Sequence, residues 1–324
     1  MTKLPKIAVI GAGLAGVSLA RSLTGFADTT LFEKSRGTGG RMSVRRREQF
    51  SFDHGAQFFT ARSKPFQAEI SNAIEAKAIV EWRPKIVNLA LGKKPFKREW
   101  FEPHYCGINE MNSLVKHMAT ALNIVHATPV TRLERQSGGW FLIGEDEQPI
   151  GPYDWIVSAV PAPQAKELLP TPFVKKYKVG EAKFSSCFAL MLAFENPVPL
   201  NFQAAVITHP ILAWMSNRDN SSVLIHSRND WATEHIDADP TWVESTMYDS
   251  IMELLPSVDR QPVHRDLHRW RYARCEQALG QDYLLDSHSQ IAAIGDWCRG
   301  GRVEDAFVSG YELAQKLKAE FGKA

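Results

Sequence analysis

Residues 7–16 read IAVIGAGLAG and decide the fold of the amino-terminal part of the chain. The apolar, β-branched run Ile7–Ile10 is typical of a buried parallel strand. Gly11, Gly13 and Gly16 follow it with G-x-G-x-x-G spacing. In that pattern the first glycine permits a tight turn, the second lets a pyrophosphate approach the backbone, and the third lets the next helix pack against the strand.

Glu33, twenty residues beyond Gly13, completes this fingerprint. A helix predicted over residues 13–23 directs its N-terminal N–H groups at the phosphates of a dinucleotide. Thr29–Phe32 is expected to be the second strand, so that Glu33 stands at its end. A carboxylate there accepts hydrogen bonds from ribose hydroxyls and repels a 2′-phosphate, which favours FAD or NAD over NADP. The remaining residues of this predicted cofactor site are Ala12, Leu14 and Lys34.

The composition fits an ordinary globular protein. With 324 residues, the chain suits two domains or one large α/β domain with an insertion. The net charge of +2 is too balanced to indicate a nucleic-acid partner. The four cysteines have no C-x-x-C spacing, so we expect neither a metal site nor a disulfide framework. No secretory signal and no apolar run of membrane-spanning length is found, so we expect a cytoplasmic protein without a membrane partner.

Arg45-Arg46-Arg47 is the only dense basic run. Such a run is typical of a solvated loop. It would alternatively attract phosphate-bearing substrates.

Two further segments suggest contact with the same dinucleotide. Residues 34–61 begin with a glycine-rich stretch that ends at Gly40 and Arg41. It is either a flexible loop or a segment whose backbone approaches the cofactor, with Arg41 pairing with the pyrophosphate. Phe52–Thr60 is expected to be a strand entering a tight site, where Gly55 and Ala56 leave room for a flat ring.

The third segment lies near the C-terminus. Gln290–Ile294 is a short apolar strand that ends at Gly295 and Asp296. Residues 297–302 are expected to form a loop, and the helical spacing of apolar residues predicts a last helix over Val303–Phe321. A chain that returns to the cofactor at its far end is typical of FAD folds. There the acid contacts the ribityl-phosphate region, and the helix N-terminus stabilises negative charge on the reduced ring.

The remaining apolar runs suggest a split chain. Residues 124–133 and 140–143 are expected to be hairpin strands, and residues 154–161 another buried strand. The predicted FAD-binding domain comprises residues 1–62, 110–170 and 288–324. The predicted substrate domain comprises residues 63–109 and 171–287, with a sheet built from four β-rich runs and helices at its edge. These runs are Cys187–Phe194, Ala204–Thr208, Ser222–His226 and Val263–Tyr272.

Four stretches together resemble the flavin-containing amine oxidase superfamily: GAGLAG, FEKSRGTGGRMS, DHGAQFFTAR and IGDWCRGGRVEDAFVSGYELA. Within it the chain is most similar to the bacterial renalase-like proteins, over essentially its whole length. HSRNDWA (226–232) and HRWRYAR (268–274) fit the same subgroup. The resemblance implies an α/β protein: a Rossmann-type FAD-binding domain with a second α+β substrate domain, in a p-hydroxybenzoate-hydroxylase-like architecture.

The resemblance also implies an activity and a set of site residues. The expected reaction oxidises the 1,2- and 1,6-dihydro isomers of NAD(P)H, with hydride transfer to the flavin and reoxidation by O₂ that releases H₂O₂. The FAD-binding pattern is matched by Gly11, Gly13, Gly16, Glu33, Gly40, Arg41, Gln57 beside the isoalloxazine, Val130 beside the adenine, Asp296 and Val303. The border of the substrate cavity is matched by Phe58, Thr60, Ala61 and Arg62.

One departure from the superfamily pattern distinguishes this chain from the amine-oxidising members. Amine-oxidising members usually place a lysine near the flavin on a substrate-domain strand, but no lysine occurs between Lys183 and Lys316. No cysteine stands where those enzymes attach flavin, so we expect non-covalent FAD. An amine oxidase, a carotenoid-type desaturase, and a non-enzymatic or structural flavoprotein or NAD-binding regulator remain alternatives.

Hydride transfer from a dihydronicotinamide needs positioning rather than acid–base catalysis, because the oxidation yields the pyridinium directly. His226 and His268 are candidates for binding the carboxamide, or are structural. Trp270 and Trp297 wall the cavity or pack in the core. Arg302 meets substrate or closes a loop. Met191, Met215 and Met247 are expected in the core.

Overall fold

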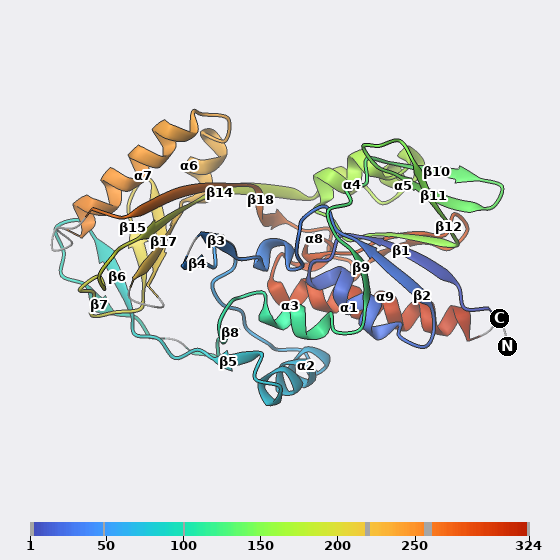
Figure 1. Cartoon of the computed structure of the whole chain (residues 1–324), viewed down its shortest axis with the longest axis horizontal. Helices are drawn as coiled ribbons and strands as arrows, with labels where there is room; N and C mark the ends of the chain where they lie inside the picture. Colours follow the sequence, from blue (N-terminus) through green and yellow to red (C-terminus); the bar gives the residue numbers. More distant parts are fainter. Residues whose placement is uncertain (1–2, 48, 100, 218–220, 256–260, 323–324) are drawn as a thin grey trace.

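A computed structural model describes residues 3–47, 49–99, 101–217, 221–255 and 261–322. The described chain forms an elongated molecule with one large sheet at each end (Figure 1). The long strands β14 (Lys183–Ala193) and β18 (His264–Gln277) pair with each other and extend from one sheet toward the other.

The first sheet has six strands in the order β19-β20-β13-β1-β2-β9. All are parallel except the edge strand β19. β1 lies between β13 and β2, so the strand order reverses beside it. Ligands of open α/β sheets bind at such a point, outside the carboxyl ends of the strands. The bounds are β1 Lys6–Ile10, β2 Asp28–Phe32, β9 Asn123–Val125, β13 Trp155–Ser158, β19 Leu284–Asp286 and β20 Ile291–Ala293.

The two faces of this sheet bury different layers, because successive side chains of a strand point to opposite faces. Ile7 and Val9 pack in a core shared with helices α1, α2, α3 and α9. Ala8 and Ile10 pack in a second core with α4, α5 and a small antiparallel sheet. The helices are α1 Leu14–Ser22, α2 Lys64–Glu75, α3 Ser113–Met118, α4 Ala162–Leu168, α5 Thr171–Lys176 and α9 Val303–Phe321, with the 3-10 turns η1 Gly40–Met42 and η2 Val179–Glu181.

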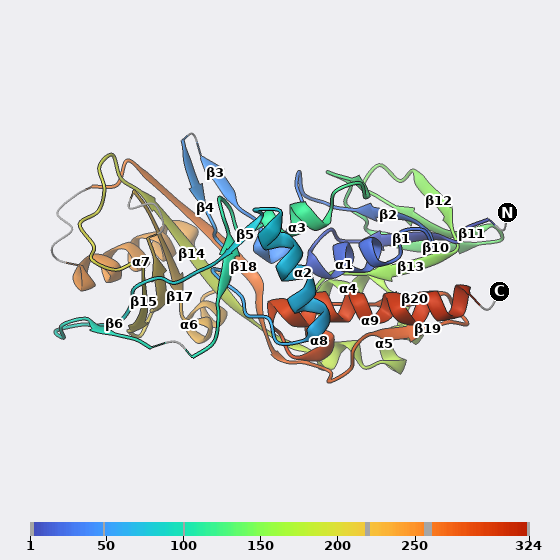
Figure 2. The same ribbon diagram turned by 90° about the horizontal axis from the view of Figure 1, so that it is seen from below.

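Helix α9 lies directly on α1. Figure 2 shows α9 along the sheet, with α2 packed near its first turns, where the Phe66 and Phe307 rings are 4.8 Å apart. Gly310 permits the contact with α1, because a Cβ there would lie 2.2 Å from the carbonyl oxygen of Ala15. The last helix is thereby fixed beside the glycine-rich turn at the other end of the chain.

The second sheet has seven strands in the order β18-β14-β17-β16-β15-β6-β7. Neighbouring strands in this sheet run antiparallel, except β15 and β6, which are parallel. One face forms a core with the helices α6 and α7. The bounds are β6 Ile86–Ala90, β7 Phe96–Lys97, β15 Ala204–Thr208, β16 Leu212–Ser216, β17 Ser222–Ser227, α6 Asn229–Glu234 and α7 Pro240–Leu254.

The opposite face of the second sheet holds a hairpin, β3 (Arg45–Arg47) and β4 (Phe50–Phe52). Phe52 packs there against Met191 and Leu224. The chain leaving the hairpin at residue 53 therefore starts on the sheet surface and runs back toward the first sheet. A separate short pair, β5 (Ile79–Glu81) and β8 (Tyr105–Gly107), lies beside α2.

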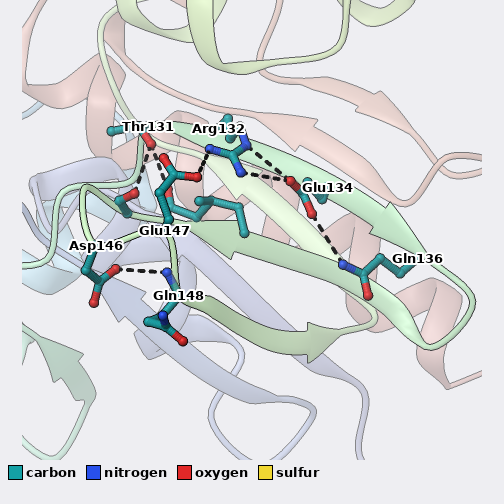
Figure 3. Close-up of polar contacts among 9 residues, drawn as sticks. Thr131, Arg132, Glu134, Gln136, Asp146, Glu147 and Gln148 are labelled. Atoms are coloured by element: carbon teal, nitrogen blue, oxygen red, sulfur yellow. Dashed lines mark hydrogen bonds and ion pairs between the residues drawn. The ribbon is translucent and has the colours of Figure 1, made fainter.

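A third sheet, β10 (Arg132–Gln136), β11 (Gly139–Ile143) and β12 (Pro149–Tyr153), covers one face of the first. On its surface Arg132 lies between the carboxylates of Glu134 and Glu147 (Figure 3). Exposed pairs of this kind add little to stability. The hydroxyl of Thr131 donates to the carbonyl of Ile143 at 3.0 Å, which fixes the start of β10.

Several expected elements are confirmed. The strands predicted over 7–10 and 29–32 are β1 and β2, and the last helix spans Val303–Phe321 as predicted. The four β-rich runs of the second half all form strands of the seven-stranded sheet. Met191, Met215 and Met247 are fully buried.

Three expectations were wrong. Residues 52–60 are not a strand beyond Phe52, because the chain passes so close to Arg41 that a Cβ on Gly55 would lie 2.0 Å from its carbonyl oxygen. Residues 124–133 do not form one strand: β9 ends at Val125, and Ala127 takes a left-handed conformation with φ +52°. Residues 297–302 are not all loop, since a short helix, α8, spans Asp296–Arg299.

The division into domains stays a prediction. Helix α2 lies in a segment expected to belong to the substrate domain, yet Phe66 and Ile70 pack in the core of the first sheet.

Among the described helices, none combines the length and apolar character needed to span a bilayer.

We predict that Gly310→Ala destabilises the fold by about 1–3 kcal/mol, because the new methyl group collides with the backbone of α1. This cost should outweigh the higher helix propensity of alanine. The measurement is urea unfolding. Gly180→Ala is the matched control, since its Cβ would meet only the Lys166 side chain, at 3.7 Å or more. Equal stability of the two variants would contradict the close packing of α1 and α9.

Candidate flavin and substrate site

Glu33 connects the glycine-rich turn to the segment that follows β2. Its carboxylate is buried, with 7% exposure. One oxygen accepts the N–H of Ala12 at 2.9 Å, and the other accepts the N–H of Ser35 at 2.8 Å. A carboxylate has about four acceptor positions, so each oxygen can still accept a hydroxyl. Glu33 is therefore held rigidly and keeps the capacity to bind a diol.

The three glycines of the fingerprint have different surroundings. Gly11 has φ +107°, and a Cβ on Gly16 would lie 2.2 Å from the carbonyl oxygen of Gly11. At these two positions the protein's own backbone leaves no room for a side chain. A Cβ on Gly13 would meet no described atom within 4 Å. Gly13 thus faces open space at the N-terminus of α1, where no side chain caps the helix and the first N–H groups lack intrahelical acceptors.

The second glycine-rich segment lies against this turn. The N–H of Gly39 donates to the carbonyl of Ala12 at 3.1 Å. The position of a Cβ on Gly40 is 3.5 Å from the Cα of Gly13. Lys34, at the start of the segment, is exposed. The structure therefore brings the predicted cofactor residues 11–16 and 33–41 together.

Arg41 and Asp296 join the second and third segments. Their side chains form a bidentate pair at 2.5 and 2.9 Å, and Arg41 also lies 3.4 Å from the carbonyl of Ala273. Burial disfavours the guanidinium charge, but Asp296 more than compensates and the pKa of Arg41 is raised. Residues 255 positions apart thus share one charge pair at the end of β20.

The C-terminal segment is fixed by its own contacts. The N–H of Gly295 donates to the hydroxyl of Ser309 at 3.0 Å, and α9 begins at Val303. The carboxylate of Glu304 accepts the N–H groups of Arg62 and Ser63. Glu304 therefore ties the predicted cavity border to the start of α9.

Two buried polar atoms near the carboxyl ends of the first sheet's strands have no hydrogen-bond partner within the described ranges. They are the amide oxygen of Asn112 and the hydroxyl of Ser158. Ser158 ends β13, and Asn112 lies beside Gly39. Such groups are costly to bury unless something binds them. Together with the open space at Gly13 and the uncapped helix, they fit a dinucleotide along the carboxyl ends of the strands.

Residues 53–57 form the bridge to the second sheet. The N–H of Ala56 donates to the carbonyl of Arg41 at 2.9 Å. The Gln57 amide nitrogen donates to the carbonyls of Asp53 and Gly55, and its oxygen accepts the hydroxyl of Ser216 at 2.6 Å. Gln57 is therefore locked in one orientation beside the glycine-rich segment.

An aromatic group surrounds Phe58. Its ring stacks on Trp82 at 5.8 Å, meets His104 edge-on at 4.8 Å and lies 5.7 Å from Trp214. Of the other predicted border residues, Thr60 and Ala61 are half-buried. Arg62 is exposed and forms a two-point ion pair with Glu102.

His54, His226, His268 and Trp270 form a second cluster. The His54 carbonyl accepts N–H groups from Trp270 at 2.8 Å and His226 at 3.1 Å. The His54 ring stacks on Trp270 at 4.9 Å and meets His268 at 4.6 Å.

Burial, with His268, Arg45 and His226 nearby, lowers the pKa of His54 to about 3. Burial and Arg45 lower the pKa of His268 to about 4, and burial lowers the pKa of His226. The cluster is uncharged at neutral pH.

Other candidates lie elsewhere. Trp297 is a core residue with no exposed surface, and its indole N–H donates to the carbonyl of Val160. The side chain of Arg302 is exposed at the start of α9. Val130 is half-buried in the third sheet's core, shortly after Thr128, whose N–H donates to the carbonyl of Glu33.

The Arg45–Arg47 run is neither a solvated loop nor a free basic patch. It forms β3, and its guanidinium groups pair with Asp266 and Glu110. Sequence reasoning missed Ser216, Glu304 and Asn112, each of which matters only through a partner distant in sequence.

Comparisons with known proteins agree with this arrangement. Residues 9–69 match an NAD(P)-binding Rossmann-like domain, and residues 89–318 match the flavin containing amine oxidoreductase family. One similar crystal structure is of a protein described as a protoporphyrinogen oxidase from Exiguobacterium sp. 255-15, with 12% identity, a TM-score of 0.75 and 99% of each chain covered. Another is a redesigned putrescine oxidase triple mutant, with 10% identity, a TM-score of 0.72 and coverage of 98% of this chain and 99% of that one. At these identities the structures show a shared fold.

The chain belongs to the flavin containing amine oxidoreductase family, and FAD is its cofactor. It has a mixed α/β fold with a Rossmann-like nucleotide-binding part.

We predict that Gly13→Val yields a folded protein without FAD. A Cβ at this position would meet no described protein atom within 4 Å, so we expect the side chain to collide with the ligand rather than with the protein. The measurement is flavin absorbance per protein after purification, with circular dichroism to verify folding. A yellow, stoichiometrically loaded Gly13→Val protein would refute the placement of the pyrophosphate.

We predict that Glu33→Ala weakens FAD binding by about 1.5–3 kcal/mol, because the ribose loses a charged acceptor. Titration of the flavin-free protein with FAD measures the effect. Asp28→Ala, at the exposed opposite end of β2, is the matched control and should bind FAD as the parent does. Unchanged affinity of Glu33→Ala would remove Glu33 from the site.

Proposed function

We propose that this protein is a renalase-like, FAD-dependent oxidase of the 1,2- and 1,6-dihydro isomers of NAD(P)H. The balanced reaction converts the dihydronicotinamide, O₂ and a proton into NAD(P)⁺ and H₂O₂. FAD supplies the two-electron chemistry. The protein is expected to have the p-hydroxybenzoate-hydroxylase-like arrangement and to act in the cytoplasm. It is also expected to divide into an FAD-binding and a substrate domain as the sequence predicts, except that α2 packs in the core of the first sheet.

The observation that carries this proposal is the cluster of His226, His268 and Trp270 packed around His54. A dihydronicotinamide is flat, and its ring carries no charge before oxidation. Its oxidation removes no proton from the ring, so the protein need only bind and orient it. Histidines with depressed pKa values can form hydrogen bonds to a carboxamide at neutral pH without adding charge.

An amine substrate is the second candidate, favoured by the match to the amine oxidoreductase family. The absence of lysine from residues 184–315 argues against it, because the lysine that amine-oxidising members usually place near the flavin then has no counterpart.

Non-covalent FAD is supported by the state of the thiols. All four cysteines are buried. Burial raises the pKa of Cys187 to about 12 and that of Cys275 to about 11, and it also raises the pKa of Cys298. Protonated, buried thiols are poor nucleophiles. FAD should therefore be released by denaturation.

We predict that the dihydro isomers bleach the flavin far faster than ordinary 1,4-dihydro-NAD. A pocket that fixes the ring by its carboxamide presents C2 or C6 at the reacting position, and a 1 Å displacement costs on the order of 10²-fold in rate. The measurement is anaerobic stopped-flow absorbance with each isomer, and with benzylamine as the amine control. Equal rates for all isomers, or no bleaching by any, would overturn the proposal. Rapid bleaching by benzylamine would favour the amine oxidase.

A further inference from the structure

Arg45 and His268 form the closest polar contact of the histidine cluster. The guanidinium Nη2 of Arg45 lies 2.6 Å from Nδ1 of His268. A guanidinium has only donors, so Nδ1 must be the acceptor of this hydrogen bond. An accepting Nδ1 carries no proton, and the neutral ring then carries its proton on Nε2. The contact thereby selects one tautomer of His268.

We propose that Arg45 is a positioning residue that holds His268 as the neutral Nε2–H tautomer, so that this N–H donates a hydrogen bond to the carboxamide oxygen of the substrate. The inference rests on the proposed function for the identity of the substrate. The tautomer itself follows from the contact and can be tested without substrate.

The two histidine candidates differ in what they can still donate. The Nε2–H of His226 is used by the carbonyl of His54, at 3.1 Å. Nε2 of His268 has no hydrogen-bond partner among the residues that the structure describes, and the residue is only half-buried. His268 is the residue whose N–H is available to a ligand, and His226 supports the backbone of residue 54.

Burial, together with the neighbouring charge of Arg45, keeps His268 neutral. Arg45 approaches from β3, and Asp266, on its own strand, pairs with both Arg45 and Arg47. His54 approaches from the segment after β4, with His226 of β17 behind it. Burial and Arg45 outweigh the opposing effect of Asp266 and lower the pKa of His268 to about 4. A neutral donor suits this reaction, because a charged imidazolium would repel the pyridinium product.

The first test is direct observation of the tautomer. Holoenzyme labelled with [¹⁵N]histidine is examined by two-bond ¹H–¹⁵N correlation spectra between pH 5 and 8, and His268→Gln assigns the signal among the ten histidines. We expect a neutral Nε2–H ring over this range. Arg45→Gln should raise the pKa of His268 by at least one unit and produce a mixture of tautomers. Arg45→Lys, which keeps the charge and a donor, should restore most of the parent behaviour.

Arg46→Gln is the matched control, because Arg46 lies in the same strand but pairs with Glu110. It should leave the His268 signal unchanged. An Nδ1–H or charged His268 in the parent protein, or an Arg45→Gln spectrum like that of the parent, would overturn the proposal.

The second test uses flavin bleaching by 1,6-dihydro-NAD. His268→Gln and Arg45→Gln should both lower the bleaching rate at least tenfold with unchanged FAD content. The Arg45→Gln rate should become pH-dependent between pH 5 and 8, falling as the ring is protonated, whereas the parent rate should not. If the parent is bleached but His268→Gln reacts equally fast, the inference fails and the proposed function stands. If the parent is not bleached by any isomer, the proposed function fails, and the donor role of His268 fails with it even where the spectra confirm the tautomer.

Discussion

The ion pair between Arg41 and Asp296 is the interaction on which the site depends. It joins a glycine-rich segment near the N-terminus to a strand end near the C-terminus, with Asp296 almost fully buried. Breaking a buried pair leaves an uncompensated charge, which is costly. The pair therefore holds two distant segments at one edge of the first sheet. That edge is also where the open space of Gly13 and the unpartnered atoms of Asn112 and Ser158 lie.

The same edge is connected to the second sheet by residues 53–57. Ala56 binds the backbone of Arg41, and Gln57 binds Ser216 on β16. The cofactor residues and the histidine cluster are thus parts of one hydrogen-bonded arrangement. A change in the cluster would therefore also disturb the residues predicted to bind the cofactor. For this reason, spectra of single histidines are more informative there than activity alone.

Much of the fold could be predicted from the sequence, because local patterns determine it. The G-x-G-x-x-G turn and Glu33 gave the first strand, helix and second strand, and helical spacing gave α9. The errors came from tertiary contacts. The chain from Phe52 onward stops being a strand because of the close approach to Arg41, which no local pattern encodes. The break of the 124–133 run at the left-handed Ala127 is equally invisible to apolar periodicity.

The candidate site stays a prediction, and the structure shows only which of its residues lie together. The cofactor residues followed from spacing and resemblance, and the structure brings Gly13, Gly40 and Glu33 together. The roles of His226 and His268 could not be separated from sequence, because both stand in β-strands. Only the partners of their ring nitrogens, His54 and Arg45, distinguish them. Glu304 was missed because a glutamate in the first turn of a helix is ordinary, and its partners lie more than 240 positions away.

The most direct test of the central claim is a double-mutant cycle on FAD affinity with Arg41→Gln, Asp296→Asn and the combined variant. If one charge pair holds the two ends of the chain around FAD, each single variant should weaken FAD binding and the double variant should bind little worse than either. The predicted coupling free energy is about 1–3 kcal/mol. Additive effects of the two substitutions, or full FAD affinity in both single variants, would contradict the account.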